Sequence, residues 1–383
     1  MYQGRGPYGS RARGARRGAW LLLAGLLMAM LSLLAGVSGA STRGWAAVTG
    51  SGGWWDTDVR GPFRSCRMIL AYNSGGMPLW TADRFRYYVT HVAPNGAPDG
   101  WFFDTVLMLA LAADSQRGFE PGYGNGPSRA EDWRWYLDQR LFGGSSELAE
   151  LERAVAVAGK ELGDPRHVVR VVIAVPYPDP RATDFGALDD VPLDFSRTED
   201  RAAAVRWYLR GVARRWTAGH FEHLRLGGFY WLREEVPDSD RALLKQVSRL
   251  VAGQLVPFYW IPYFGGSGWD QWRELGFDVA IQQPNYFFYQ VPPERLKEAA
   301  HFAWDHRMGV EMELDRRVME SEERRSRYLS YLRAGVEQGY QEAGTLAWYD
   351  DSALLECARS QDPAARHLYD ATYDFIRGVY PGG

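Results

Sequence analysis

Eight apolar segments of strand length recur along the chain, and helix-like sequence follows each of them. They lie at 66–73, 101–111, 167–177, 224–232, 255–263, 277–285, 310–314 and 345–350. The segments are continuous apolar runs rather than alternating ones, which is typical of strands that are covered on both faces. Strands of this kind that alternate with helical segments indicate parallel βαβ units.

Eight such units in a row predict a single (β/α)8 TIM barrel of class α/β over residues 63–380. The competing arrangement is an open, doubly wound parallel sheet. That architecture usually carries a GxGxxG turn after its first strand. This chain has AYNSGGMP at that point, which does not match. The barrel is therefore the expected fold.

The first 40 residues have a composition of their own. Residues 1–19 contain five arginines and no acidic residue, and an apolar run at 20–37 is followed by Ser-Gly-Ala. This order predicts a secretory signal peptide at 1–40, and hence a secreted or envelope-associated protein. The alternatives are a twin-arginine signal at Arg16-Arg17 and an uncleaved anchor, which alone would place the protein at a membrane. The Gly- and Ser-rich stretch 41–62 is expected to be a flexible tether.

Charge and metal-ligand patterns exclude two classes of function. Loss of the five N-terminal arginines would change the formal charge from −3 to −8. An acidic mature chain is not expected to bind nucleic acid, which is recognised by basic patches. The seven histidines form no HExxH or HxH motif, so we expect neither a catalytic metal nor a cofactor.

Carboxylates lie just after the fourth predicted strand and within the seventh. Glu234 comes after the fourth strand, and Glu311 and Glu313 lie in the seventh. Strands of a closed parallel barrel end at one rim, where the active sites of barrel enzymes lie. A carboxylate pair across that rim is what cleavage of a glycosidic bond requires, so Glu234 and Glu313 are the candidate catalytic residues. Glu311 faces the same side as Glu313 but lies deeper. The alternative is that these acids only end their strands and pair with nearby arginines.

Other polar and aromatic side chains at the strand ends are candidates for binding sugar. Gln283 and Asn285 stand in the sixth strand where apolar residues would be expected, and buried amides need hydrogen-bond partners. Aromatic rings stack on the apolar faces of sugars, and their polar tips can still form hydrogen bonds. Together with Glu311 and these two amides, the expected substrate-binding residues are Tyr72, Trp260, Tyr263, Tyr286, Trp348 and Asp350.

Four of these segments resemble a known family. They are Tyr-Trp-x-x-Glu at 230–234, Trp-Ile-Pro-Tyr at 260–263, Gln-Pro-Asn-Tyr at 283–286 and Gly-Val-Glu-x-Glu at 309–313. In this order they are similar to the bacterial family called domain of unknown function 4855, over about residues 66–380. The resemblance implies a secreted (β/α)8 barrel like the retaining glycoside hydrolases of clan A. In that clan the acid/base glutamate of strand four usually follows an asparagine, whereas Arg233 precedes Glu234 here.

The expected function is therefore that of an exported, monomeric, retaining glycoside hydrolase acting on a bacterial or environmental polysaccharide. A different class of function also fits the sequence: a carbohydrate-binding or cell-envelope protein that keeps the barrel without catalysis. A metal-dependent polysaccharide deacetylase fits less well, because the chain has no cluster of His and Asp ligands.

Overall fold

The computed structural model describes residues 53, 66–342 and 344–381. The expected signal peptide at 1–40 lies outside the described residues, and so does the expected tether at 41–62, apart from Gly53. None of the helices in the described part of the chain is long and apolar enough to span a membrane.

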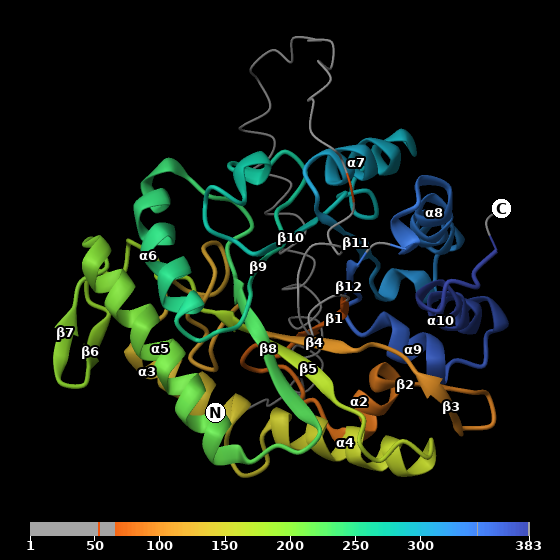
Figure 1. Cartoon of the computed structure of the whole chain (residues 1–383), viewed down its shortest axis with the longest axis horizontal. Helices are drawn as coiled ribbons and strands as arrows, with labels where there is room; N and C mark the ends of the chain where they lie inside the picture. Colours follow the sequence, from red (N-terminus) through yellow and green to blue (C-terminus); the bar gives the residue numbers. More distant parts are fainter. Residues whose placement is uncertain (1–52, 54–65, 343, 382–383) are drawn as a thin grey trace, which may run out of the picture. The chain divides into compact units, whose positions relative to one another are not determined.

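Parallel strands form a closed eight-stranded barrel (Figure 1). In chain order they are β1 (Cys66–Tyr72), β4 (Thr105–Leu109), β5 (Val169–Val175), β8 (Leu224–Trp231), β9 (Phe258–Trp260), β10 (Val279–Gln282), β11 (Gly309–Glu313) and β12 (Thr345–Tyr349). Each strand pairs with its neighbour in chain order, and β12 closes the barrel against β1. The predicted (β/α)8 fold is therefore confirmed. Each strand lies inside its predicted segment, except that β11 begins one residue before the predicted 310–314.

Helices surround the barrel (Figure 1). They are α2 (Ala82–Val89), α3 (Ala130–Trp135), α4 (Glu147–Glu161), α5 (Thr198–Gly219), α6 (Arg241–Ala252), α7 (Glu294–Asp305), α8 (Glu322–Gln338), α9 (Ala353–Arg359) and α10 (Pro363–Ile376), with a π-helical turn η1 (Tyr136–Leu141) after α3. Side chains of Thr81, Ser146, Ser321 and Asp362 accept hydrogen bonds from first-turn amides, which fixes where α2, α4, α8 and α10 begin. Short 3-10 turns lie at η2 (Asp238–Asp240), η3 (Trp269–Gln271), η4 (Arg316–Met319) and η5 (Tyr340–Glu342).

Two antiparallel hairpins stand apart from the barrel, β2 (Thr90–Val92) with β3 (Pro98–Trp101) and β6 (Gly186–Leu188) with β7 (Val191–Leu193). The first hairpin shortens the predicted second strand, because Trp101 pairs with Thr90 and the barrel strand begins only at Thr105. The ring nitrogens of His91 lie 2.7 Å from Asp99 and 2.8 Å from Asp370, which ties this hairpin to α10.

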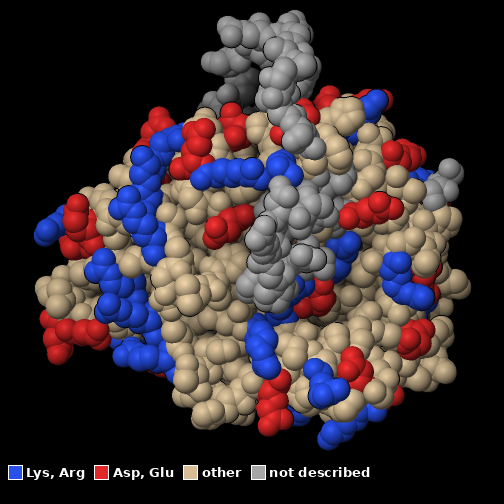
Figure 2. Space-filling view, in the orientation of Figure 1, with Lys and Arg blue, Asp and Glu red and all other residues tan. Residues whose placement is uncertain are grey.

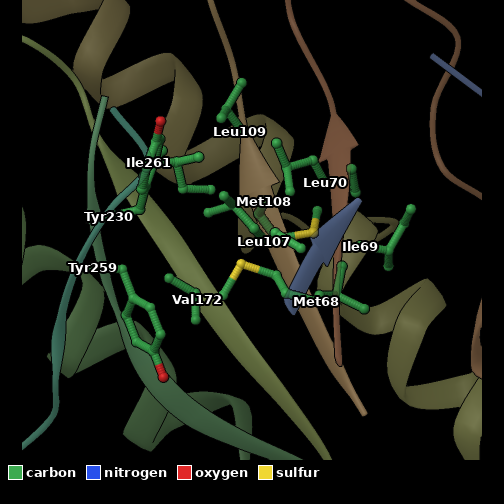
Figure 3. Close-up of a cluster of buried hydrophobic side chains, with 14 of the residues drawn as sticks. Met68, Ile69, Leu70, Leu107, Met108, Leu109, Val172, Tyr230, Tyr259 and Ile261 are labelled. Atoms are coloured by element: carbon green, nitrogen blue, oxygen red, sulfur yellow. The ribbon is translucent and has the colours of Figure 1, made fainter. Parts of the chain in front are cut away.

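The interior of the barrel is filled by side chains rather than open. Inward-facing residues form rows across neighbouring strands. Leu70, Leu107 and Val172 are in register in one row, Tyr230 and Tyr259 in another, and all five are buried (Figure 3). Outward-facing residues of the same strands pack beneath the helices. A filled interior of this kind leaves the rim at the carboxyl ends of the strands as the place where a site can form.

Candidate active site

Three glutamates meet at the rim formed by the carboxyl ends of the strands. Glu311 and Glu313 are alternate residues of β11, and both point inward. They are only 3% and 2% exposed. Glu234 lies three residues beyond the end of β8 and is partly exposed. The charge of Glu313 raises the pKa of Glu234, and the charges of Glu313 and Glu234 both raise the pKa of Glu311. The structure therefore brings the three sequence-predicted carboxyl groups together.

Glu313 is surrounded by hydrogen-bond donors. Its Oε2 accepts from the Tyr331 hydroxyl of α8 and from the Tyr286 backbone N–H at 3.2 Å. Its Oε1 accepts a long bond of 3.4 Å from Asn285 Nδ2. Burial raises the pKa of Glu313 to about 7, while the bonds from Tyr331, Tyr286 and Asn285 lower it. Donors to a carboxylate favour its charged form.

Glu234 has fewer donors. Burial raises its pKa to about 7, a hydrogen bond from Gln283 lowers it, and the charges of Glu313 and Glu235 raise it. Its Oε2 is buried without a hydrogen-bond partner among the described residues. The donors around Glu313 favour its carboxylate form, and a negative charge on Glu313 favours the protonated form of Glu234. The two carboxyl groups therefore have unequal surroundings.

Two amides connect the carboxyl groups. Gln283 donates to the Ile261 carbonyl at 2.9 Å, and Asn285 Nδ2 donates to Gln283 Oε1 at 3.2 Å as well as to Glu313. Asn285 Oδ1 accepts from the Phe264 N–H at 2.7 Å, and its backbone is left-handed with φ of 50°. Asparagine tolerates that conformation better than most residues. Both predicted amides lie beside the glutamates. Their hydrogen bonds described above are made to other groups of the protein.

The predicted aromatic residues are divided between the rim and the core. Tyr72 and Tyr263 are partly exposed at the rim. The Tyr263 hydroxyl donates to Glu235 at 2.9 Å, and the Tyr72 ring meets Tyr349 edge-on at 5.3 Å. Tyr286 is only 4% exposed; its ring packs against Tyr331, so its backbone N–H, rather than its ring, serves the site.

Three of the predicted substrate contacts need correction. Trp260 and Trp348 are fully buried, because they alternate with inward-facing neighbours and point out beneath the helices. Trp260 stacks on Phe277 at 4.8 Å, and Trp348 Nε1 donates to the Tyr328 hydroxyl. Asp350 is fully buried too, and accepts hydrogen bonds from the Tyr88 hydroxyl and two backbone N–H groups, which fix the start of α9.

Three further residues belong to the site but were missed from the sequence: Glu120, Tyr123 and Tyr230. The charge of Glu234 raises the pKa of each. Tyr230 faces inward on β8, in register with Tyr259, but a continuous apolar run does not show which of its residues face inward. Glu120 and Tyr123 lie in the Gly/Pro-rich loop after β4, where no periodic signal marks the side chains that turn inward.

A hollow of about 350 Å³ lies elsewhere, lined by residues 270–274 and 305–307. It contains none of the three glutamates, so the candidate site is placed by its carboxyl groups and not by this hollow. In the part of the chain that the structure describes, no three His, Cys, Asp or Glu side chains are arranged to hold a metal ion.

Comparisons with known proteins give one family and several structures. The family described as "Domain of unknown function (DUF4855)" matches residues 67–374. A candidate α-L-fucosidase from Bacteroides thetaiotaomicron VPI-5482 is 15% identical, with 82% of this chain and 94% of that chain covered and a TM-score of 0.44. A GH18 chitinase from Pseudoalteromonas aurantia is 12% identical (79% and 98% covered, TM-score 0.38). A tryptophan synthase α-subunit mutant from Pyrococcus furiosus is 11% identical (82% and 99% covered, TM-score 0.38). No curated protein matches the sequence.

Proposed function

We propose that this chain, which belongs to the DUF4855 family, is a retaining glycoside hydrolase that cleaves a polysaccharide. The observation that supports the proposal most strongly is the unequal surroundings of Glu234 and Glu313. Glu313 accepts hydrogen bonds from several donors, whereas one oxygen of Glu234 has no partner among the described residues. The pKa of each group is raised to about 7. An acid and a carboxylate side by side on one rim are the two groups that glycoside cleavage needs.

In the first step Glu234 gives its proton to the glycosidic oxygen while Glu313 attacks the anomeric carbon. The carbon–oxygen bond of the leaving group breaks and an ester bond to Glu313 forms. Tyr331 and Tyr286 hold Oε2 of Glu313, which leaves the weakly bonded Oε1 as the attacking atom. In the second step Glu234 takes a proton from water, the water oxygen attacks the anomeric carbon, and the ester bond breaks.

The remaining rim residues would bind substrate hydroxyl groups. Glu311 lies deeper than Glu313 on β11, and its charge acts on the partly exposed Tyr72. Tyr263 is partly exposed too and donates a hydrogen bond to Glu235. Export through the 1–40 segment would bring the enzyme to a polymer too large to enter a cell. The scheme uses no cofactor and a single protomer.

A panel of bacterial exopolysaccharides and cell-wall glycans tests the proposal. Purified wild-type protein should release reducing ends from at least one glycan. Glu313→Gln should reduce the release to background, because the amide keeps the shape but cannot act as the nucleophile. Glu342→Gln is the matched control, since Glu342 is exposed in η5, at the opposite end of β12 from the site. It should behave as wild type.

Equal release by Glu313→Gln and the wild type would refute the proposed role of Glu313. A glycan that binds tightly without being cleaved would instead favour the carbohydrate-binding function. Thermal unfolding of each variant shows whether a loss of activity reflects a loss of folding.

A further inference from the structure

Carboxyl groups at the rim lack the partners that buried acids have elsewhere in this protein. Among the described residues no donor is hydrogen-bonded to Glu311, although its side chain is almost completely buried. One oxygen each of Glu120 and Glu234 is also buried without a partner within the described chain. Burial and the charges of Glu234, Glu311 and Glu120 all raise the pKa of Tyr230, whose side chain faces inward on β8. Because buried polar groups are normally satisfied, carboxyl groups without partners in this part of the rim are suited to a ligand that donates hydrogen bonds.

Other buried acids of this protein have partners. Asp350 accepts hydrogen bonds from the Tyr88 hydroxyl and two backbone N–H groups, and three more acids are paired with arginine. The pairs are Asp132 with Arg117 at 2.6 Å, Glu147 with Arg140 at 3.1 Å, and Asp240 with Arg201 at 2.9 Å. Basic and acidic side chains are also interspersed over the molecular face in Figure 2. The unpaired acids of the rim therefore depart from the pattern of the rest of the molecule.

The one arginine that acts on Glu120 is already engaged. Arg233 lowers the pKa of Glu120 through its charge, but its Nη2 donates to Glu235 at 2.9 Å and its Nη1 to the Tyr177 hydroxyl at 2.9 Å. Catalysis as proposed above uses Glu234 and Glu313. Glu311 and Glu120 are left over, and neither forms an ion pair with a basic side chain of the described residues.

We propose that the site takes a sugar residue with a protonated amino group, as in a de-N-acetylated hexosamine polysaccharide, and that Glu311 and Glu120 accept hydrogen bonds from that ammonium. An ammonium supplies three donors and a positive charge, which is what unpaired carboxyl groups need. N-acetylation would remove that charge, and a uronic acid would add a repulsive one. This inference rests on the proposed function and names its substrate class.

Electrostatics at Glu311 are consistent with this assignment. Burial and the charges of Glu313 and Glu234 raise the pKa of Glu311 well above its usual range. A bound ammonium would lower that pKa, because a positive charge favours the carboxylate form of Glu311. The hydroxyls of Tyr72 and Tyr230, whose pKa values are raised by Glu234 and Glu311, stay protonated and can donate to the sugar oxygens.

Calorimetry with defined tetrasaccharides tests the inference. The probes are glucosamine and galactosamine tetramers, their N-acetylated counterparts and a glucose tetramer, measured on Glu313→Gln to prevent turnover. At least one amino tetramer should bind about tenfold or more tightly than its N-acetylated form. Adding Glu311→Gln should remove this preference, and adding Glu342→Gln should not. Glu120→Gln, in a loop and partly exposed, gives a second test should Glu311→Gln impair folding.

The inference is overturned if no amino tetramer binds, if the N-acetylated forms bind as tightly, or if the preference survives both Glu311→Gln and Glu120→Gln. These outcomes are distinct from failure of the proposed function. Cleavage of a neutral glycan by wild-type protein would leave the hydrolase proposal standing and remove only the amino-sugar assignment. Preferential binding of an amino tetramer without cleavage of any glycan would support the amino-sugar assignment and contradict the hydrolase proposal.

Discussion

Glu313 is held by donors from two parts of the chain that are remote from β11. Tyr331 reaches it from α8, while Asn285 and the Tyr286 backbone reach it from the segment after β10. These contacts stabilise the carboxylate that the proposed mechanism requires. They also fix which oxygen is available, since only one of the two is strongly bonded.

We expect Tyr331→Phe to shift the pH dependence of catalysis. In the wild type the hydrogen bond from the Tyr331 hydroxyl lowers the pKa of Glu313. Removal of that hydroxyl should raise this pKa and move the acidic limb of the pH profile of kcat/KM to higher pH. The shift should be on the order of one pH unit, with about 1 kcal/mol lost from the free energy of unfolding. Tyr328→Phe is the control, because it removes another buried hydroxyl of α8 that bonds Thr372 and Trp348. A limb that moves equally in both variants would contradict the role of Tyr331.

At the residue scale the sequence predicts the glutamates but not every neighbour. Carboxylates after apolar strands are conspicuous, and a strand end fixes their place on the rim. A continuous apolar run does not show which of its residues face the barrel interior and which face the helices, because both faces of a barrel strand are buried. Trp260 and Tyr263 are therefore alike in sequence, although one points under the helices and the other lies at the rim.

At the scale of the elements, the position of Glu313 depends on close packing between β11 and β12. A Cβ added at Gly309 would lie 2.3 Å from the carbonyl oxygen of Thr345. Glycine at the start of β11 therefore allows the two strands to pair in the register that sets Glu313 beside Tyr349.

Gly309→Ala should push these strands apart and cost about 1–3 kcal/mol of unfolding free energy, as overpacking does. It should also lower kcat by displacing Glu313. Gly144→Ala is the control, since its added Cβ meets no atom within 4 Å and its stability should change by less than about 0.5 kcal/mol. Urea unfolding measures both variants. Equal stabilities would show that the β11–β12 contact can relax.

The elements themselves were largely predictable, because most barrel strands lie within longer apolar segments of the sequence. The exception is the second segment, whose first residues pair in the β2–β3 hairpin instead of the barrel. Local sequence could not reveal this pairing, since the hairpin is held by hydrogen bonds between His91 and both Asp99 and the distant Asp370. Glu120 was hidden for a related reason, because only the folded loop brings it close to Glu234 and Arg233.

At the scale of the whole molecule, export is a prediction that concerns residues outside the described part of the chain. The arginine-rich start and the apolar run at 20–37 predict a mature chain beginning near Ser41. N-terminal sequencing of the protein from its native host tests this. An intact Met1 on soluble cytosolic protein would contradict export, and an intact membrane-bound chain would favour the anchor.

The acidic rim should also affect the stability of the whole barrel. The pKa of Glu311 is higher in the folded than in the unfolded chain, so its contribution to stability is present below about pH 4.3 and is lost as pH rises through the folded value. Glu311→Gln does not titrate. Relative to the wild type, it should therefore be more stable at pH 8 than at pH 5, and Glu342→Gln should show no such difference. Thermal unfolding at both pH values measures this, and a constant difference would argue that Glu311 is not strained by burial.

The central claim, that Glu313 is a nucleophile, is tested most directly by chemical rescue. Glu313→Ala should be inactive on an aryl glycoside that suits the wild type, and added azide should restore turnover by entering the vacated space. The product, identified by NMR, should be a glycosyl azide of anomeric configuration opposite to that of the substrate. Glu313→Ala that stays active without azide, or an azide product of unchanged configuration, would contradict the assignment.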